Sequence, residues 1–383
     1  MIPVNEPLLG KAELNKVAAC IKSNWISSQG KYLIEFEEKF ARYCGVKYGI
    51  STTSGTTALH LALAAIGVGP GDEVLIPTFT MAATAFAVCY CGATPVFVDS
   101  DSETFNIDLE RVSTYLRSQE KRGKIKAKAI LPVHMYGHPV DMDPLLDIAD
   151  RFSLTVIEDA AEAHGAEYKG KRCGGFGAFG CFSFYANKII TTGEGGMVVT
   201  NDPRLADKAR RLKDLAHSPG KRFLHTDVGF NYRMTNLQAA LGVAQLKKIN
   251  SHIKKKRRMA KEYEKSLKGI PGLRLPVEKP WAKNVYWMYG ILVENAFGLS
   301  RDQLMAQLKI QGIDTRSFFV PMHLQTVFKD KAVKSKRFGR YPVAERLSEQ
   351  GLYLPSGLTI SRDQIRYIGG QIKRLAAEAF KRK

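Results

Sequence analysis

The chain of 383 residues has few cysteines, and their spacing argues against two common kinds of site. The six cysteines include no pair of Cys-x-x-Cys motifs of the kind that holds zinc, and no dense pattern typical of small disulfide-bonded domains. The closest pair is Cys89 and Cys91, for which apolar packing in a reducing cytoplasm is the expected role. We therefore expect no metal site and no disulfide framework.

The sequence also lacks an export signal and a convincing membrane span. Residues 1–7 carry neither a charged segment nor an apolar one, so we expect a cytoplasmic protein without a membrane partner. The uncharged stretch 74–98 is long enough to cross a bilayer, but Pro77, Gly92 and Pro95 argue against a single helix. The pattern predicts a strand at 74–79, a helix at 80–91 and a strand at 94–98.

Acidic residues are scarce relative to basic ones, 37 against 57, which gives a formal net charge of +20. Such a charge can attract nucleic acid. In the densest basic run, 247–258, Leu246, Ile249 and Ile253 have helical spacing, which predicts an apolar face and an opposite, solvated basic face. No nucleic-acid-binding motif accompanies the run. We therefore expect no nucleic-acid partner, and a basic surface that attracts an anionic ligand or solvates the protein.

Apolar segments alternate with helical ones along most of the chain, which is typical of an α/β protein with a mainly parallel sheet. The turn residues Pro271, Gly272 and Pro276 follow the basic helix and precede a second, smaller α/β unit. This unit is expected to contain a strand at 285–293, a helix at 300–311 and a final helix from Ser361. Strands of the larger unit are expected near 47–52, 73–77, 94–99, 128–134, 154–158, 181–185 and 196–200.

The most informative segment is the run Ser183-Phe-Tyr-Ala-Asn-Lys188, which is followed by a glycine-rich turn at 193–196. Glycines allow the backbone to approach closely where side chains would collide. An amine in such a dry, crowded place is easily deprotonated, as an amine that forms a Schiff base must be. Most lysines are solvated surface charges, so the interpretation of Lys188 depends on two further segments.

The first is a carboxylate that follows a buried strand. The apolar run 154–157 predicts a parallel strand, and Asp159 falls at its carboxyl end, the edge where α/β sheets bind ligands. A carboxylate there can keep the ring nitrogen of pyridoxal phosphate protonated. The alternative is that Asp159 caps a helix. Glu162 and His164 either line the same site or face solvent.

The second is the segment 54–57, Ser-Gly-Thr-Thr, between a short strand and an Ala/Leu-rich helix. Free N–H groups and hydroxyls at a helix start form an anion site. Ordinary helix capping uses the same residue types. Together with Lys188 and Asp159, the segment supplies the phosphate-binding part of a pyridoxal phosphate site.

Taken together, the chain resembles the sugar aminotransferases of fold type I, the DegT/DnrJ/EryC1/StrS family of pyridoxal phosphate enzymes. The resemblance covers essentially the whole chain, and the lysine motif and the motif Asn231-Tyr-Arg-Met-Thr are the most specific parts of it. The segments that carry it are 25–28, 54–63, 69–74, 132–137, 157–163, 187–197, 229–236 and 286–289.

The resemblance implies a large pyridoxal phosphate domain at 1–250, with a mainly parallel seven-stranded sheet, and a smaller C-terminal α/β domain at 251–383. It implies that Lys188 forms a Schiff base with the cofactor and that Asp159 pairs with the pyridine nitrogen. Further implied cofactor contacts are Gly55, Thr56, Thr57, Met81, Glu162, Ser183 and Asn231, and possible substrate contacts are Trp25, Arg316 and His323.

Two of these positions carry additional expectations. Asn231 resembles the asparagine that reaches the phosphate from the neighbouring subunit, so the resemblance implies a homodimer with shared active sites. Met81 stands where the family usually has an aromatic residue stacked on the pyridine ring, although a thioether can also cover a ring.

The implied reaction moves the amino group of L-glutamate, through pyridoxamine phosphate, to C4 of a nucleotide-linked 4-keto-6-deoxy sugar for surface polysaccharide synthesis. GDP-4-keto-6-deoxymannose is the favoured substrate, and UDP- or dTDP-4-keto-6-deoxyglucose is the alternative. A sugar dehydratase of the family would carry histidine in place of Lys188, and a non-enzymic binding protein would be expected to have lost Lys188 or Asp159. The nucleotide and the sugar stereochemistry remain open at this point.

Overall fold

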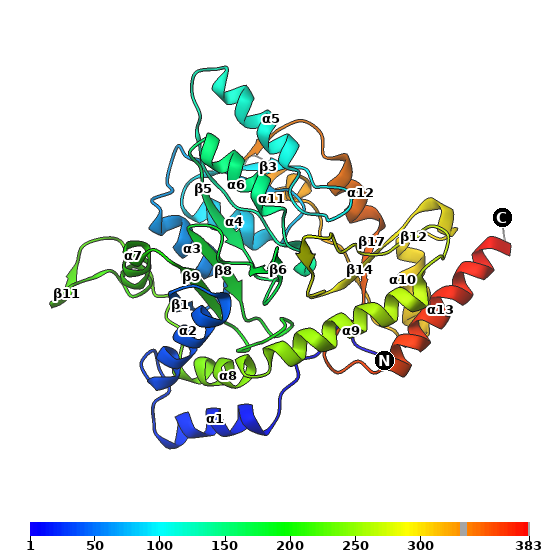
Figure 1. The fold of residues 1–383 in the computed structure, drawn as a ribbon, viewed down its shortest axis with the longest axis horizontal. Coiled ribbons are helices and arrows are strands. Elements are labelled where there is room, and N and C mark those ends of the chain that lie inside the picture. Colours follow the sequence, from blue (N-terminus) through cyan, green and yellow to red (C-terminus); the bar gives the residue numbers. More distant parts are fainter. Residues whose placement is uncertain (330–334, 382–383) are drawn as a thin grey trace.

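The structure, a computed structural model, describes residues 1–329 and 335–381 (Figure 1). Its centre is an eight-stranded sheet in the order β1-β9-β8-β5-β4-β2-β3-β16. The strands from β8 to β16 run parallel, whereas β9 is antiparallel to both of its neighbours. The strands are β1 (Tyr48–Thr52), β2 (Glu73–Pro77), β3 (Thr94–Val98), β4 (Ala127–Ile130), β5 (Thr155–Asp159), β8 (Phe179–Ser183), β9 (Gly196–Thr200) and β16 (Lys336–Arg337).

The seven strands expected from the sequence are therefore confirmed, and the uncharged stretch 74–98 forms β2, a helix and β3 as predicted. The eighth strand, β16, was not predicted, because two basic residues give no apolar run. In the part of the chain that the structure describes, no helix is both long and apolar enough to span a membrane.

Helices cover both faces of the sheet, because alternate residues of a strand point to opposite faces. In β2, Val74 and Ile76 pack into one apolar cluster with residues of α2, α3, α4, α7 and α8, whereas Leu75 packs into another with residues of α5 and α6. The helices of this part of the fold are α1 (Lys11–Lys22), α2 (Lys31–Cys44), α3 (Gly55–Ala65), α4 (Ala82–Tyr90), α5 (Leu109–Glu120), α6 (Met142–Arg151), α7 (Pro203–Lys213) and α8 (Asn236–Leu246).

A smaller antiparallel sheet, β12-β14-β17-β15, packs against α9, α10 and α13 on the right of Figure 1 and has its own apolar cluster. The strand predicted at 285–293 is shorter than expected. The helix predicted at 300–311 is confirmed within one residue at both ends, and the final helix begins one residue after the predicted Ser361. The elements are α9 (Ile249–Leu267), β12 (Leu273–Arg274), β14 (Tyr289–Val293), α10 (Arg301–Ile310), β15 (Arg316–Ser317), α12 (Pro342–Gln350), β17 (Gly351–Leu354) and α13 (Arg362–Lys381).

Short elements complete the fold. The hairpin β10–β11 (His217–Ser218 and Lys221–His225) extends away from the main body at the left of Figure 1. A three-stranded sheet joins β6 (Glu167–Tyr168), β7 (Lys171–Arg172) and β13 (Ala282–Lys283). A helical turn, α11 (Thr326–Lys329), precedes β16, and 3-10 turns lie at Met135–Gly137, Asn295–Phe297 and Met322–Leu324.

The first residues of the chain lie on the smaller sheet rather than on the large one. Ile2 forms a bridge with Ile313, and the N–H of Ser356 donates to the carbonyl of Val4 at 2.7 Å. The amino-terminal segment therefore connects the two parts of the molecule close to the site described next.

Candidate active site

A cavity of about 440 Å³ lies at the carboxyl ends of β5 and β8, the edge of the sheet where the sequence placed the site. Its walls come from the start of α3, the loop between β2 and α4, the segments after β5 and β8, and three aromatic side chains from the C-terminal part of the chain. Of the predicted residues, it brings together Gly55, Thr56, Met81, Asp159, Glu162, Ser183 and Lys188.

The start of α3 forms one end of this cavity. Ser54 caps the helix: its Oγ accepts from the N–H of Thr57 at 3.2 Å, and the Thr57 hydroxyl accepts from the N–H of Ser54 at 2.9 Å. Thr57 is thus occupied in capping and is not among the residues that line the cavity. The N–H groups of Gly55 and Thr56 belong to the first helical turn, so they have no acceptor within the helix. They leave a positively polarised anion site at the cavity.

Gly55 is required by space rather than by backbone conformation. A Cβ at this position would lie 2.7 Å from the Cβ of Ser183 at the end of β8. Any side chain would therefore push the helix start and the strand end apart and widen the anion site.

We expect Gly55→Ala to weaken binding of a phosphate-bearing cofactor by about tenfold or more, because overpacking of this size costs about 1–3 kcal/mol. Equilibrium dialysis of the cofactor against the cofactor-free protein measures the effect. Gly69→Ala is the matched control, since a Cβ there meets no atom within 4 Å. Equal affinities for the two variants would show that the contact of Gly55 with Ser183 does not shape the site.

Asp159 ends β5 and is 5% exposed. Its Oδ2 accepts from the Thr84 hydroxyl at 2.9 Å, and its Oδ1 accepts from the N–H of Ala161 at 3.2 Å. Burial raises the pKa of Asp159, although these hydrogen bonds and the charge of Lys188 act in the opposite direction. No helix begins after Asp159, since residues 160–166 form turns, so the alternative role as a helix cap is wrong.

Lys188 lies on the loop after β8, and its Nζ is 3.8 Å from the centroid of the Trp287 ring. Burial lowers the pKa of Lys188, and the carboxylates of Glu162 and Asp159 offset part of this effect. The loop is fixed through the carbonyl of Asn187, which accepts from Trp287 Nε1 at 2.9 Å and from Asn5 Nδ2 at 2.8 Å. The amine is thus held over one aromatic face, beside two carboxyl groups, with a pKa below that of a solvated lysine.

Glu162 is the second carboxyl group of the cavity. Its Oε2 accepts from the N–H of Tyr136 at 2.7 Å. Burial raises the pKa of Glu162 to about 7; the charge of Lys188 and the Tyr136 hydrogen bond lower it, and Asp159 raises it. His164 adopts neither of the two roles considered for it, because it is fully buried among Phe40, Phe182 and Phe184.

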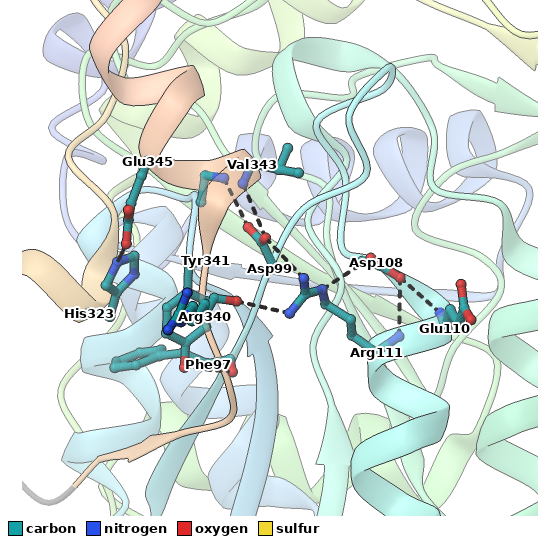
Figure 2. A network of polar contacts seen from close by, with 11 residues as sticks. Phe97, Asp99, Asp108, Glu110, Arg111, His323, Arg340, Tyr341, Val343 and Glu345 are labelled. Carbon is teal, nitrogen blue, oxygen red and sulfur yellow. Dashed lines mark hydrogen bonds and ion pairs between the residues drawn. The ribbon is translucent and has the colours of Figure 1, made fainter.

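His323, a predicted substrate contact, is buried beside the cavity and is not among its lining residues. Its Nδ1 lies 2.7 Å from Thr78 Oγ1, its Nε2 lies 3.1 Å from Glu345 Oε1, and its ring stacks on Tyr341. Figure 2 shows His323 at the edge of a polar network in which Asp99 accepts from the first N–H groups of α12. In this chain it joins the loop after β2 to α12.

Three other predicted contacts lie outside the lining of the cavity. Trp25 is 57% exposed near the end of α1. Arg316 is exposed on β15, with a guanidinium nitrogen 3.7 Å from Asp314 Oδ2. Asn231 is exposed, and its Oδ1 accepts from Arg233 Nε at 3.0 Å. None of the three is placed by this single chain in contact with the other site residues.

Several lining residues were missed by the sequence reasoning. Trp287, Phe319 and Tyr353 come from the C-terminal part of the chain, and Tyr185 and Glu194 from the lysine loop. Trp287 falls within the segment 286–289 that carries the family resemblance, so a pattern for it existed. Phe319 lies in a loop and Tyr353 in the short strand β17, and nothing in the sequence connects them to the cavity.

The DegT/DnrJ/EryC1/StrS aminotransferase family matches residues 7–373. The chain belongs to this family. It is 45% identical to the GDP-perosamine synthase of Caulobacter vibrioides (94% of each chain covered) and 42% identical to that of Escherichia coli O157:H7 (96% of each). It is 38% identical to the dTDP-3-amino-3,4,6-trideoxy-alpha-D-glucose transaminase of Streptomyces venezuelae (88% and 87% covered).

A crystal structure of a family aminotransferase from Brucella abortus superposes with a TM-score of 0.89 at 32% identity, covering 95% of each chain. The chain is therefore a fold type I aminotransferase, and pyridoxal 5′-phosphate is its cofactor. The residues present fit this group. The start of α3 offers free N–H donors for a phosphate, Asp159 offers a buried carboxylate for a ring nitrogen, and Lys188 offers an amine of lowered pKa in the same cavity.

Proposed function

We propose that the enzyme transfers an amino group from L-glutamate to C4 of GDP-4-keto-6-deoxymannose and so forms GDP-perosamine, a precursor for surface polysaccharide. An amino donor and a keto-sugar acceptor follow from the family. The observation that carries the activity is that Lys188 and Asp159 share one cavity with a free anion site. The similarity to two GDP-perosamine synthases over more than nine-tenths of the chain supports the GDP-linked sugar.

Pyridoxal phosphate supplies the electron sink that stabilises a carbanion at the amino-acid α-carbon. We propose that the Asp159 carboxylate would keep the ring nitrogen of the cofactor protonated. Hydrogen bonds from the Thr84 hydroxyl and the N–H of Ala161 hold this carboxylate in place. Lys188 holds the cofactor between turnovers. With an amino acid bound in its place, its Nζ would be positioned to take the α-proton as base and to return it as acid.

The environment of Lys188 suits this work. Because burial lowers its pKa, a larger fraction of the amine is neutral near pH 7 than for a solvated lysine. Trp287 limits the directions from which water reaches the amine. Glu162, whose pKa is about 7, can take up a proton beside Lys188 without creating a second buried charge. Lys188 would be the acid and base in both halves of the reaction, in which the amino group of glutamate, which leaves as 2-oxoglutarate, passes by way of the cofactor to the sugar ketone.

The substrate assignment is tested by incubating the enzyme with glutamate and, in turn, GDP-4-keto-6-deoxymannose and UDP- and dTDP-4-keto-6-deoxyglucose. We expect the highest kcat/KM for the GDP-linked sugar and a 4-amino product identified by mass and NMR. Preference for a UDP- or dTDP-linked sugar would instead support the alternative, a 4-aminotransferase of 4-keto-6-deoxyglucose. Formation of 2-oxoglutarate is followed separately, so a wrong sugar is distinguished from a wrong activity.

We also propose that the working unit is a homodimer in which Asn231 serves the cofactor phosphate of its neighbour. The support is that Asn231 is exposed in the single chain, lies outside the cavity and belongs to a motif characteristic of the family.

We propose a reducing cytoplasm as the compartment of the enzyme, since all six cysteines are free thiols.

Complementation tests the shared site. Each mixed dimer of inactive Lys188→Ala and Asn231→Asp subunits should regain about one working site of two, because two-fold symmetry places both lesions at one site and leaves the other intact. An equal mixture that has exchanged at random should therefore reach up to about a quarter of the wild-type activity, since about half of its dimers are mixed. Subunit exchange is verified by native mass spectrometry with one subunit isotopically labelled. Exchanged dimers that stay inactive would contradict the proposal, as would a fully active monomer.

A further inference from the structure

Lys256 is the one member of the basic run on α9 that the sequence analysis placed wrongly. It was expected on a solvated face, but it is only 2% exposed. The spacing explains the difference. Ile249, Ile253, Lys256 and Ala260 follow one another at intervals of three or four residues, so they share the buried face of the helix.

Within the described part of the chain, the hydrogen bonds of the Lys256 ammonium go to backbone carbonyls alone. Its Nζ donates to the carbonyl of Trp287 at 2.7 Å and to the carbonyl of Ser356. Among the described residues, no carboxylate lies within ion-pair distance of it. Burial lowers the pKa of Lys256 to about 7, and no neighbouring charge offsets this effect. Burying the charged amine of a lysine costs free energy of folding. The hydrogen bonds that this amine donates to the two carbonyls therefore need an explanation.

The first acceptor leads directly to the active site. Trp287 is fixed by its N–H, which donates to the Tyr136 carbonyl at 2.9 Å, and by its indole Nε1, which donates to the Asn187 carbonyl. The same indole covers the Nζ of Lys188 at 3.8 Å. Lys256 therefore binds the backbone carbonyl of Trp287. The Trp287 indole in turn covers the Lys188 amine and donates to the carbonyl of Asn187, the residue before it.

The second acceptor leads to the same place from another side. Ser356 follows β17, which carries the cavity residue Tyr353, and its N–H donates to the Val4 carbonyl. Asn5, which follows Val4 in the chain, donates from its side chain to the Asn187 carbonyl at 2.8 Å. The Asn187 carbonyl, just before Lys188, thus accepts from Trp287 and from the amino-terminal segment that Ser356 holds through Val4.

We propose that Lys256 is a positioning residue of the active site: it ties Trp287 to Ser356 and thereby fixes the 187–188 peptide and the indole over Lys188. This inference rests on the role proposed for Lys188. An apolar residue of similar length would fill the space, but it would leave two buried carbonyls without a donor and the Trp287 segment free to shift.

Lys256→Met tests the proposal, with Lys254→Met as the matched control on the exposed side of the same helix. The holoenzyme is assayed for 2-oxoglutarate formation from glutamate in a single turnover. We expect the rate constant to fall about tenfold to hundredfold for Lys256→Met with little change in glutamate affinity, since small misplacements of reacting groups cost rates of this order. Lys254→Met should stay within about twofold of wild type.

A second readout does not depend on turnover. The chain has three tryptophans, so Trp25→Phe with Trp281→Phe leaves Trp287 as the only indole. In this background, the cofactor-free Lys256→Met protein should show red-shifted, less structured emission from Trp287, and the Lys254→Met protein should not. If Lys256→Met does not fold, Lys256→Gln retains a donor for one carbonyl and is measured in its place.

A double-mutant cycle separates positioning from general stability. If Lys256 acts through Trp287, the rate losses of Lys256→Met and Trp287→Phe should combine to less than their product. A folded variant at position 256 with a rate within about twofold of wild type and unshifted emission would overturn the proposal, and so would strictly multiplicative losses. Failure of the GDP-sugar assignment would leave these glutamate-stage measurements unaffected.

Discussion

Lys188→Ala should lose at least about 10⁴-fold of the single-turnover rate with glutamate, because it removes the amine that both holds the cofactor and moves the α-proton. The side chain makes no hydrogen bond to another described side chain, and its Nζ lies over the Trp287 ring. The variant should therefore keep its fold, and a thermal unfolding midpoint near that of wild type verifies this. The rate is measured as 2-oxoglutarate formed per subunit.

Lys47→Ala is the control, since Lys47 is exposed and its side chain makes none of the described hydrogen bonds or ion pairs. It should match wild type in rate. A Lys188→Ala rate within about tenfold of wild type, in folded protein that binds cofactor, would contradict the role of Lys188 and would point to another amine in the cavity.

Asp159→Asn should lose about 3 kcal/mol of transition-state stabilisation, roughly a hundredfold in rate. Asparagine has nearly the same shape, but it lacks the charge that keeps a ring nitrogen protonated. The loss should fall on proton abstraction, so a substrate deuterated at the α-carbon should show a larger isotope effect in the variant. Asp147→Asn on the exposed side of α6 is the control and should leave the rate unchanged.

Stability should move in the opposite direction from activity in this variant. Burial raises the pKa of Asp159, so in the cofactor-free protein the ionised carboxylate destabilises the fold at neutral pH. That penalty shrinks as the pH falls through the folded-state pKa and is absent only below the unfolded-state pKa. Cofactor-free Asp159→Asn should therefore unfold at the same or a higher temperature than wild type at pH 7.

The rate measurement decides the catalytic role separately. An Asp159→Asn variant whose single-turnover rate with glutamate is within a few-fold of wild type would show that Asp159 has a structural role only.

The large sheet and the centre of the site could be predicted from the sequence because the same pattern encodes both. Each buried parallel strand is a short apolar run, and the chemistry follows where the run ends, as with Asp159 after β5 and Ser183 at the end of β8. Gly55 marks the break between β1 and α3 in the same way. Local order along the chain is sufficient for these positions, since parallel strands bring their carboxyl ends to one edge.

The rest of the site depends on contacts between distant segments, which no local pattern shows. Phe319 and Tyr353 reach the cavity only because the smaller sheet packs against the larger one. Lys256 has the charge of a surface residue but the helical phase of a core residue, and charge was the wrong guide. The hydrogen bonds of His323 to Thr78 and Glu345 join residues far apart in the chain, so no local pattern predicts them.

Borohydride reduction of the holoenzyme, followed by peptide mapping, tests the central claim that Lys188 carries the cofactor. Reduction fixes the cofactor to the amine that binds it, and the added mass identifies the residue. The account predicts one pyridoxyl group per subunit, on the peptide that contains Lys188, and none on this peptide after prior incubation with glutamate in excess. A label on any other lysine, Lys256 included, or a holoenzyme that cannot be labelled, would contradict it.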